Sequence, residues 1–183
     1  MACSGTTYDH AIDDLGYINL WDIRHSGRRS LWKLEQIDVA CIDFCPLEKQ
    51  LLATSGGDGI KVWNTASGTV KANISILNDE ITCLLWSPFR KEILFAHNNF
   101  LSLASFSSDE GHVLAKWEHF PKPNIVNDCD GFTGILSLHH LRNGKVVSID
   151  TERRLCEHTA FLDQKPSEDT QNLINPEFST VIR

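Results

Sequence analysis

The sequence contains no apolar run near the ~20 residues that a transmembrane helix needs, and its Lys and Arg residues form no basic block. Its 17 basic residues are outnumbered by 24 acidic residues, which gives a formal net charge of −7. Because neutralising phosphates needs clustered Lys and Arg, we expect neither a nucleic-acid partner nor a membrane partner. The first residues also lack the basic and apolar regions of a signal peptide. We therefore expect a reducing compartment, in which the six cysteines are free thiols.

Motifs for catalysis, metals and cofactors are also missing, so we expect no enzyme, no metal and no cofactor. The glycine-rich run 56–59 precedes a β-branched segment rather than a helix, which predicts a hairpin turn instead of a phosphate loop. Cys41 and Cys45 would lie roughly 13 Å apart along one strand, whereas zinc ligands lie within ~2.3 Å of one ion. We expect these two cysteines in the core. His139 and His140 should point to opposite faces of a strand, one of them buried and the other exposed.

What the sequence does contain is a repeat. With 183 residues of which 42% are hydrophobic, the chain has the size of one globular domain, or of a domain with a tail. Three pairs of segments share one offset of 42 residues. The pairs are Trp21 and Trp63, residues 39–46 and 81–88, and residues 51–53 and 93–95. A further unit begins at Ile135. A period of about 40–45 residues with Trp-Asp near the end of the unit is typical of WD40 repeats, which form four-stranded propeller blades.

The sequence therefore predicts an all-β WD40 β-propeller over residues 1–162, followed by a flexible tail over residues 163–183. It accounts for about three and a half blades of an expected seven-bladed ring, so the chain is expected to be part of a larger propeller or a truncated product of one. We expect Trp21, Trp63 and Trp86 to pack between blades rather than to form a ligand cage. Residues 164–172 of the tail are polar and aperiodic, and a flexible segment of about 20 residues would reach on the order of 25 Å.

Residues 45–68 and 81–94, together with the terminal Ile182-Arg183, resemble one group of WD40 proteins. They are similar to the later blades of fizzy-type activators, the co-activators of the anaphase-promoting complex, whose chains also end in Ile-Arg. The resemblance implies a substrate-recruiting adaptor that is found in the nucleus and cytoplasm. Its partners would be degron-bearing substrates and a tetratricopeptide-repeat subunit of the ligase, which would hold Ile182 and Arg183. The chain looks like a divergent branch, such as the fungal meiosis-specific one, and a mitotic or a meiotic role stays open.

The family also implies a degron site in the last blade. There the family carries an Asp-Glu-Thr-Leu-Arg-aromatic-Trp turn, whose acidic residue meets a degron arginine. In this chain Asp150 and Arg154 align with the turn, the acidic residue is displaced to Glu152, and Cys156 replaces the Trp. Asp150 and Glu152 would bind the arginine through charge-assisted contacts; the alternative is that they are solvated turn carboxylates. Two other functional interpretations stay open, a generic WD40 scaffold and a non-functional fragment of an activator.

Overall fold

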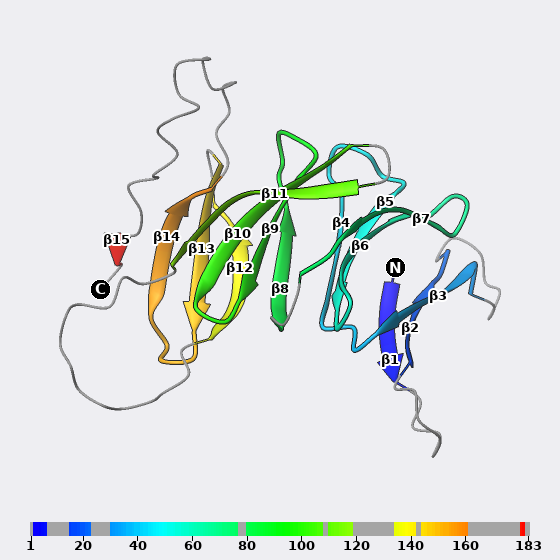
Figure 1. Cartoon of the computed structure of the whole chain (residues 1–183), viewed down its shortest axis with the longest axis horizontal. Coiled ribbons are helices and arrows are strands. Elements are labelled where there is room, and N and C mark those ends of the chain that lie inside the picture. The colour runs from blue at the N-terminus through cyan, green and yellow to red at the C-terminus, as the bar shows by residue number, and fades with distance from the viewer. Residues whose placement is uncertain are drawn as a thin grey trace.

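The computed structural model of the chain describes residues 2–6, 15–22, 30–76, 80–107, 110–118, 134–141, 144–160 and 180–181. Within these ranges the regular elements are strands, as the sequence predicts, and they stand side by side as small sheets (Figure 1). No helix in the described ranges has the length and hydropathy needed to cross a membrane.

The described strands form three sheets, of three, eight and four strands. The eight-stranded sheet consists of two antiparallel units of four strands, so the chain has four such units, which we call the first to fourth blades. The first blade contains β1 (Ala2–Thr6), β2 (Leu15–Leu20) and β3 (Trp32–Ile37). The second contains β4 (Cys41–Phe44), β5 (Leu51–Gly56), β6 (Gly59–Asn64) and β7 (Thr69–Ile74). The third contains β8 (Ile81–Trp86), β9 (Glu92–His97), β10 (Phe100–Ser107) and β11 (Glu110–Glu118). The fourth contains β12 (Ile135–His140), β13 (Lys145–Asp150), β14 (Leu155–Thr159) and β15 (Thr180–Val181).

The second and third blades have the same strand order at the predicted spacing. Phe44 ends β4, and Trp86 ends β8 42 residues later. Each blade is a meander in which consecutive strands pair. The second and third blades also touch at one parallel pair, Asn73 of β7 with Glu110 of β11. The repeat found in the sequence is therefore the blade itself, and the partial WD40 propeller is confirmed.

Apolar side chains fill the space between neighbouring blades. Alternate residues of a strand point to opposite faces, so Leu52 packs with the first blade while Leu51 and Ala53 pack with the third. Likewise, β9 sends Ile93 and Phe95 toward the second blade and Leu94 and Ala96 toward the fourth. Both faces of β5 and β9 are consequently buried, which explains the unbroken apolar runs 51–53 and 93–96.

A buried chain of hydrogen bonds joins the first blade to the second. The Trp63 indole N–H donates to Thr54 Oγ1 over 2.8 Å, and the Thr54 hydroxyl donates to Gln36 Oε1. The Gln36 amide in turn donates to Asp58 Oδ1 over 2.9 Å and to the Gly59 carbonyl over 3.1 Å. Gln36 and Thr54 are at most 1% exposed. Each buried polar group of this Gln36 network has a partner, so the network fixes the position of β3 against β5 and β6.

Two glycines of the second blade are required by geometry. Gly59 has φ of 102° and closes the β5–β6 hairpin opposite Gly56, which confirms the predicted turn. Gly68 has φ of 71°, and a Cβ there would lie 2.6 Å from the ring of Trp32. The Trp32 ring thus covers the β6–β7 turn of the next blade, where its indole N–H donates to the Thr65 carbonyl over 2.9 Å.

The expected packing role of the tryptophans is confirmed for Trp63 and Trp86, which are 5% and 0% exposed. Trp86 packs edge-on against Phe106 at 5.6 Å between ring centroids. Trp21, which follows β2, is half-buried.

Two features differ from expectation. The first blade has a third strand, β3, which the repeat did not indicate. Thr180 and Val181, inside the segment expected to be a tail, form β15 and pair with Glu157 and Cys156 of β14. The tail was expected from the polar run 164–172, whereas Thr180 and Val181 are β-branched residues, which favour a strand, and they pair with the open edge of β14 through backbone groups. Residues 163–179, 182 and 183 of the expected tail lie outside the described residues.

We predict that Thr54→Val destabilises the chain by about 2 kcal/mol, because buried Trp63 Nε1 and Gln36 Oε1 each lose a partner. Chemical denaturation measures the change. Thr69→Val is the matched control, since Thr69 is exposed and bonds only to Ser67 nearby; its effect should stay within about 0.5 kcal/mol. Equal losses of stability in the two variants would contradict a contribution of the Gln36 network to the free energy of unfolding.

Candidate functional site

The turn between β13 and β14 contains the carboxylates predicted to meet a degron arginine. Asp150 ends β13 and is fully buried. Its Oδ1 accepts the backbone N–H groups of Glu152 and Arg154 at 3.0 and 2.8 Å, and its Oδ2 accepts the Arg154 Nε–H at 2.6 Å. Arg153, at φ of 63°, lets the chain reverse. Asp150 therefore organises the turn from within and presents no surface to a ligand.

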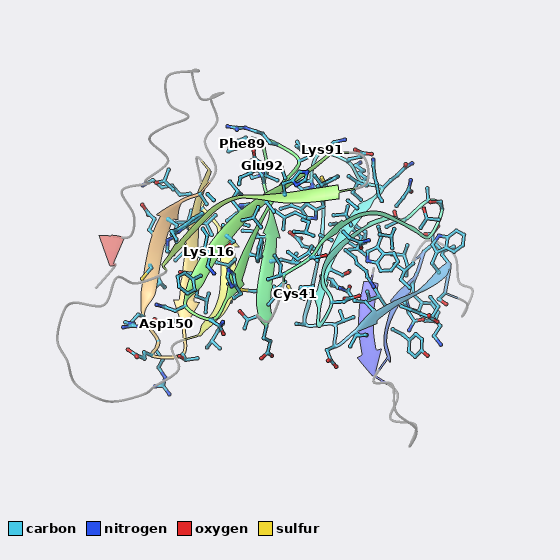
Figure 2. The ribbon with its side chains drawn as sticks, in the orientation of Figure 1. Cys41, Phe89, Lys91, Glu92, Lys116 and Asp150 are labelled. Carbon is cyan, nitrogen blue, oxygen red and sulfur yellow. The ribbon has the colours of Figure 1, made fainter. Side chains whose placement is uncertain are left out.

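Glu152 lies on the outside of the same turn, at the end of the fourth blade where Figure 2 labels Asp150. Its side chain is 53% exposed, and its Oε2 lies 3.0 Å from Arg154 Nη1. Arg154 is thus held between one buried and one exposed carboxylate. The structure brings the two predicted residues together around Arg154 and leaves the carboxylate of Glu152 accessible to solvent.

The other predicted site residues, Ile182 and Arg183, lie outside the described residues. They follow directly after β15, whose Val181 pairs with Cys156 of β14. The predicted docking of Ile182 and Arg183 stays a prediction.

The cysteines behave as core residues. Cys45 is 2% exposed and Cys41 is half-buried, and no described group of three His, Cys, Asp or Glu side chains could hold a metal ion. Burial raises the pKa of the Cys83 thiol to about 12. It also raises the pKa of Cys41. These thiols are therefore protonated at neutral pH, and the thiolate is the reactive form.

The expectation for the histidine pair was wrong, because His139 and His140 are both exposed. They lie at the end of β12, where the neighbouring third blade no longer covers the strand: the buried residues that pack with that blade are Ile135, Leu138 and Val146.

Asp43 is a functional candidate that the sequence analysis missed. It lies on β4, and its Oδ2 accepts the backbone N–H of Trp86 at 2.9 Å, while its carbonyl accepts the Trp86 indole N–H at 2.9 Å. Burial raises the pKa of the Asp43 carboxyl, and the N–H of Trp86 and nearby His140 counteract that rise. One signal was present: Asp43 stands where the next repeat has Leu85. Its bonds to Trp86 join the second and third blades, so its role is to hold β4 against β8.

Comparison with known proteins finds sequence relatives of this chain. No protein-family model matches the chain. The WD repeat-containing protein slp1 of Schizosaccharomyces pombe is 35% identical over 97 residues, which are 50% of this chain and 20% of slp1. The meiosis-specific APC/C activator protein AMA1 of Saccharomyces cerevisiae is 31% identical over 51% of this chain and 17% of its own length. An Arabidopsis thaliana protein named cell division cycle 20.4, cofactor of APC complex, is 31% identical over 72% of this chain and 29% of its own length.

This chain is a relative of the WD-repeat activators of the anaphase-promoting complex. It spans about a fifth of the length of the first relatives that it matches. Several of the relatives are named as activators or cofactors of that complex, and slp1 is named as a WD repeat-containing protein. The crystal structure of the mitotic checkpoint complex contains a chain of the same fold, with a TM-score of 0.61. The match covers 76% of the present chain and 42% of that chain, at 24% sequence identity.

We predict that Asp150→Ala lowers the free energy of unfolding by about 3 kcal/mol, because the buried Arg154 contact and two backbone N–H groups lose their acceptor. Asp150→Asn keeps an acceptor oxygen and should lose less. Thermal and denaturant unfolding measure both. Glu157→Ala, which breaks the exposed contact with Lys145, serves as control with an expected loss below about 1 kcal/mol. A loss for Asp150→Ala no larger than that of the control would contradict the organising role of Asp150.

Proposed function

We propose that this chain is a substrate-recruiting co-activator of the anaphase-promoting complex, in which the blades bind degron peptides and the chain end binds the ligase. The observation that carries the proposal is sequence identity. The matched parts of the chain are 31–35% identical to slp1, to the APC/C activator AMA1 and to a plant cofactor of the APC complex. Because the chain spans a minor part of these relatives, the blades described here would supply only part of such a protein's contacts. The protein would act in the nucleus and cytoplasm.

The chemistry of the chain end supports the ligase contact. Ile182 offers an apolar side chain, and Arg183 offers a forked guanidinium beside a free carboxylate. A concave helical-repeat surface can capture a terminal carboxylate with backbone or basic donors, and an acidic side chain can pair with the guanidinium through two parallel hydrogen bonds. The tetratricopeptide-repeat subunit of the ligase is the partner proposed for this end.

For the degron contact, the exposed carboxylate of Glu152 is the better of the two candidates. Asp150 is already saturated by Arg154 and the turn backbone. Glu152 shares Arg154 with Asp150 and has its other side open to solvent. A degron arginine could approach there without displacing a buried bond, and Asp150 would act by positioning the turn.

A generic WD40 scaffold is the second candidate function. It would use the same blades for an unrelated partner and would be indifferent to the last two residues of the chain. A fragment that lacks function would bind neither ligase nor degron.

We predict that removal of Ile182 and Arg183 abolishes binding to purified anaphase-promoting complex, because the Ile182 side chain and the Arg183 guanidinium are lost together and the terminal carboxylate moves back to Val181. Co-sedimentation or surface plasmon resonance with the intact complex measures this. Removal of Gln171 and Asn172 is the matched control, since it shortens the same segment by the same length and keeps the chain end. Equal binding by the intact and clipped chains would rule out a ligase contact through Ile182 and Arg183 and would favour the generic WD40 scaffold.

We also predict that Glu152→Gln weakens binding of an arginine-containing degron peptide by up to about fivefold, the range of an exposed ion pair. Isothermal titration calorimetry measures the affinity, with the same peptide carrying glutamine for arginine as reference. Glu35→Gln, which changes an exposed side chain on β3, is the control variant. If Glu152→Gln and Glu35→Gln bind the peptide equally well, the carboxylate contact does not exist.

A further inference from the structure

At the opposite end of the strands from Glu152, two equivalent turns expose apolar side chains beside lysines. The β4–β5 turn exposes Leu47, which is 49% accessible, and the β8–β9 turn exposes Phe89, which is 37% accessible. The two residues occupy the same place in successive repeats, each directly after a proline. Figure 2 shows Phe89 and Lys91 at the upper end of the blades and Asp150 at the lower end. We call Leu47, Phe89, Lys49, Lys71 and Lys91 together the apolar-basic rim.

One carboxylate joins these two turns into a single surface. Glu48 lies next to Leu47, and its Oε2 pairs with Lys91 Nζ of the next blade at 2.5 Å. Its Oε1 lies 3.7 Å from Lys71 Nζ on β7. Beneath the turns, the bonds between Asp43 and Trp86 hold the ends of β4 and β8 together. The rim is therefore continuous from one blade to the next and rests on rigid strands.

The rim carries a local excess of positive charge. Glu48 alone faces the two ammonium groups of Lys71 and Lys91, and the pKa of its carboxyl is lowered, chiefly by the hydrogen bond from Lys91. Lys49 is exposed and makes no ion pair within the described part of the chain. Arg90 of the second turn pairs with Glu92 at 3.4 Å, so the charges of these two side chains cancel. The remaining charges of the rim sum to a positive value in a chain whose net charge is −7.

We propose that the apolar-basic rim binds an acidic segment of a partner protein that carries one bulky apolar side chain. The apolar side chain lies against Leu47 and Phe89, where its burial supplies the driving force. The flanking carboxylates face Lys49, Lys71 and Lys91, which give orientation and a faster association. This charge preference is opposite to the one proposed for Glu152, whose carboxylate would pair with a degron arginine. This inference does not depend on the proposed ligase contact.

The test is fluorescence anisotropy with a labelled synthetic peptide in which Asp and Glu flank a single phenylalanine. Three competitors define the selectivity: the same peptide with alanine for phenylalanine, the same peptide with Lys for Asp and Glu, and a single-stranded oligonucleotide of matched charge. We expect the acidic peptide with phenylalanine to bind best and its affinity to fall as salt is added. The full chain is used throughout.

Two variants locate the contact. We expect Phe89→Ala to weaken binding about tenfold through lost apolar burial, and Lys49→Glu to weaken it about fivefold or more through charge reversal. Both residues are exposed, so folding should persist, and thermal unfolding checks this. Leu114→Ala and Lys116→Glu are the matched controls on β11, and Figure 2 places Lys116 away from the rim.

The inference is overturned by any of four results: no binding of the acidic peptide, equal binding of the basic peptide, equal losses in the β11 controls, or equal competition by the oligonucleotide. The last result would assign the rim to polyanions in general rather than to a protein segment. Because the assay contains no ligase and leaves the chain end intact, failure of the rim and failure of the ligase contact are separate outcomes.

Discussion

Strands β5 and β9 carry apolar side chains on both faces, and each of them therefore needs a blade on either side. Leu51 and Leu52 are adjacent in the chain yet belong to different cores. The rest of the structure follows from this requirement, because a blade that buries both faces cannot be stable by itself and ties its neighbours into one stack. Hydrogen bonds of Gln36 and Asp43 also join neighbouring blades. Because hydrogen bonds are directional and apolar contacts are not, these bonds fix the relative position of the blades.

The sequence predicted the middle blades well because their signal is apolar and periodic. Leu51-Leu52-Ala53 and Ile93-Leu94-Phe95 recur at one offset, and the turn glycines separate the strands. β3 was missed for the opposite reason. It alternates exposed Lys33 and Glu35 with Leu34 and Gln36, and a buried glutamine is no apolar signal. Its burial depends on Thr54 and Asp58, which are distant in sequence and lie close only after the blades pack.

The sequence predicted which residues form the candidate site, Asp150 and Glu152, but not what each of them does. The resemblance brought Asp150 and Glu152 to attention as a pair, yet nothing in the sequence separates a carboxylate that builds a turn from one that faces solvent. That distinction comes from the Asp150 contacts with the backbone of Glu152 and Arg154, which require the turn to exist first. The apolar-basic rim was not found for the same reason, because nothing in the sequence distinguishes the exposed side chains of Leu47 and Phe89 from apolar core residues before the strands are placed.

The pairing of β15 with β14 changes how far the end of the chain can travel. Val181 is held by its pairing with Cys156, and two residues span at most about 7 Å, so Ile182 and Arg183 follow within that distance of the β14–β15 ladder. If the proposed ligase contact at Ile182 and Arg183 exists, the partner would bind beside the open edge of β14 or would first have to separate β15 from β14. In the second case the backbone pairs of β15 would compete with the partner for the same segment.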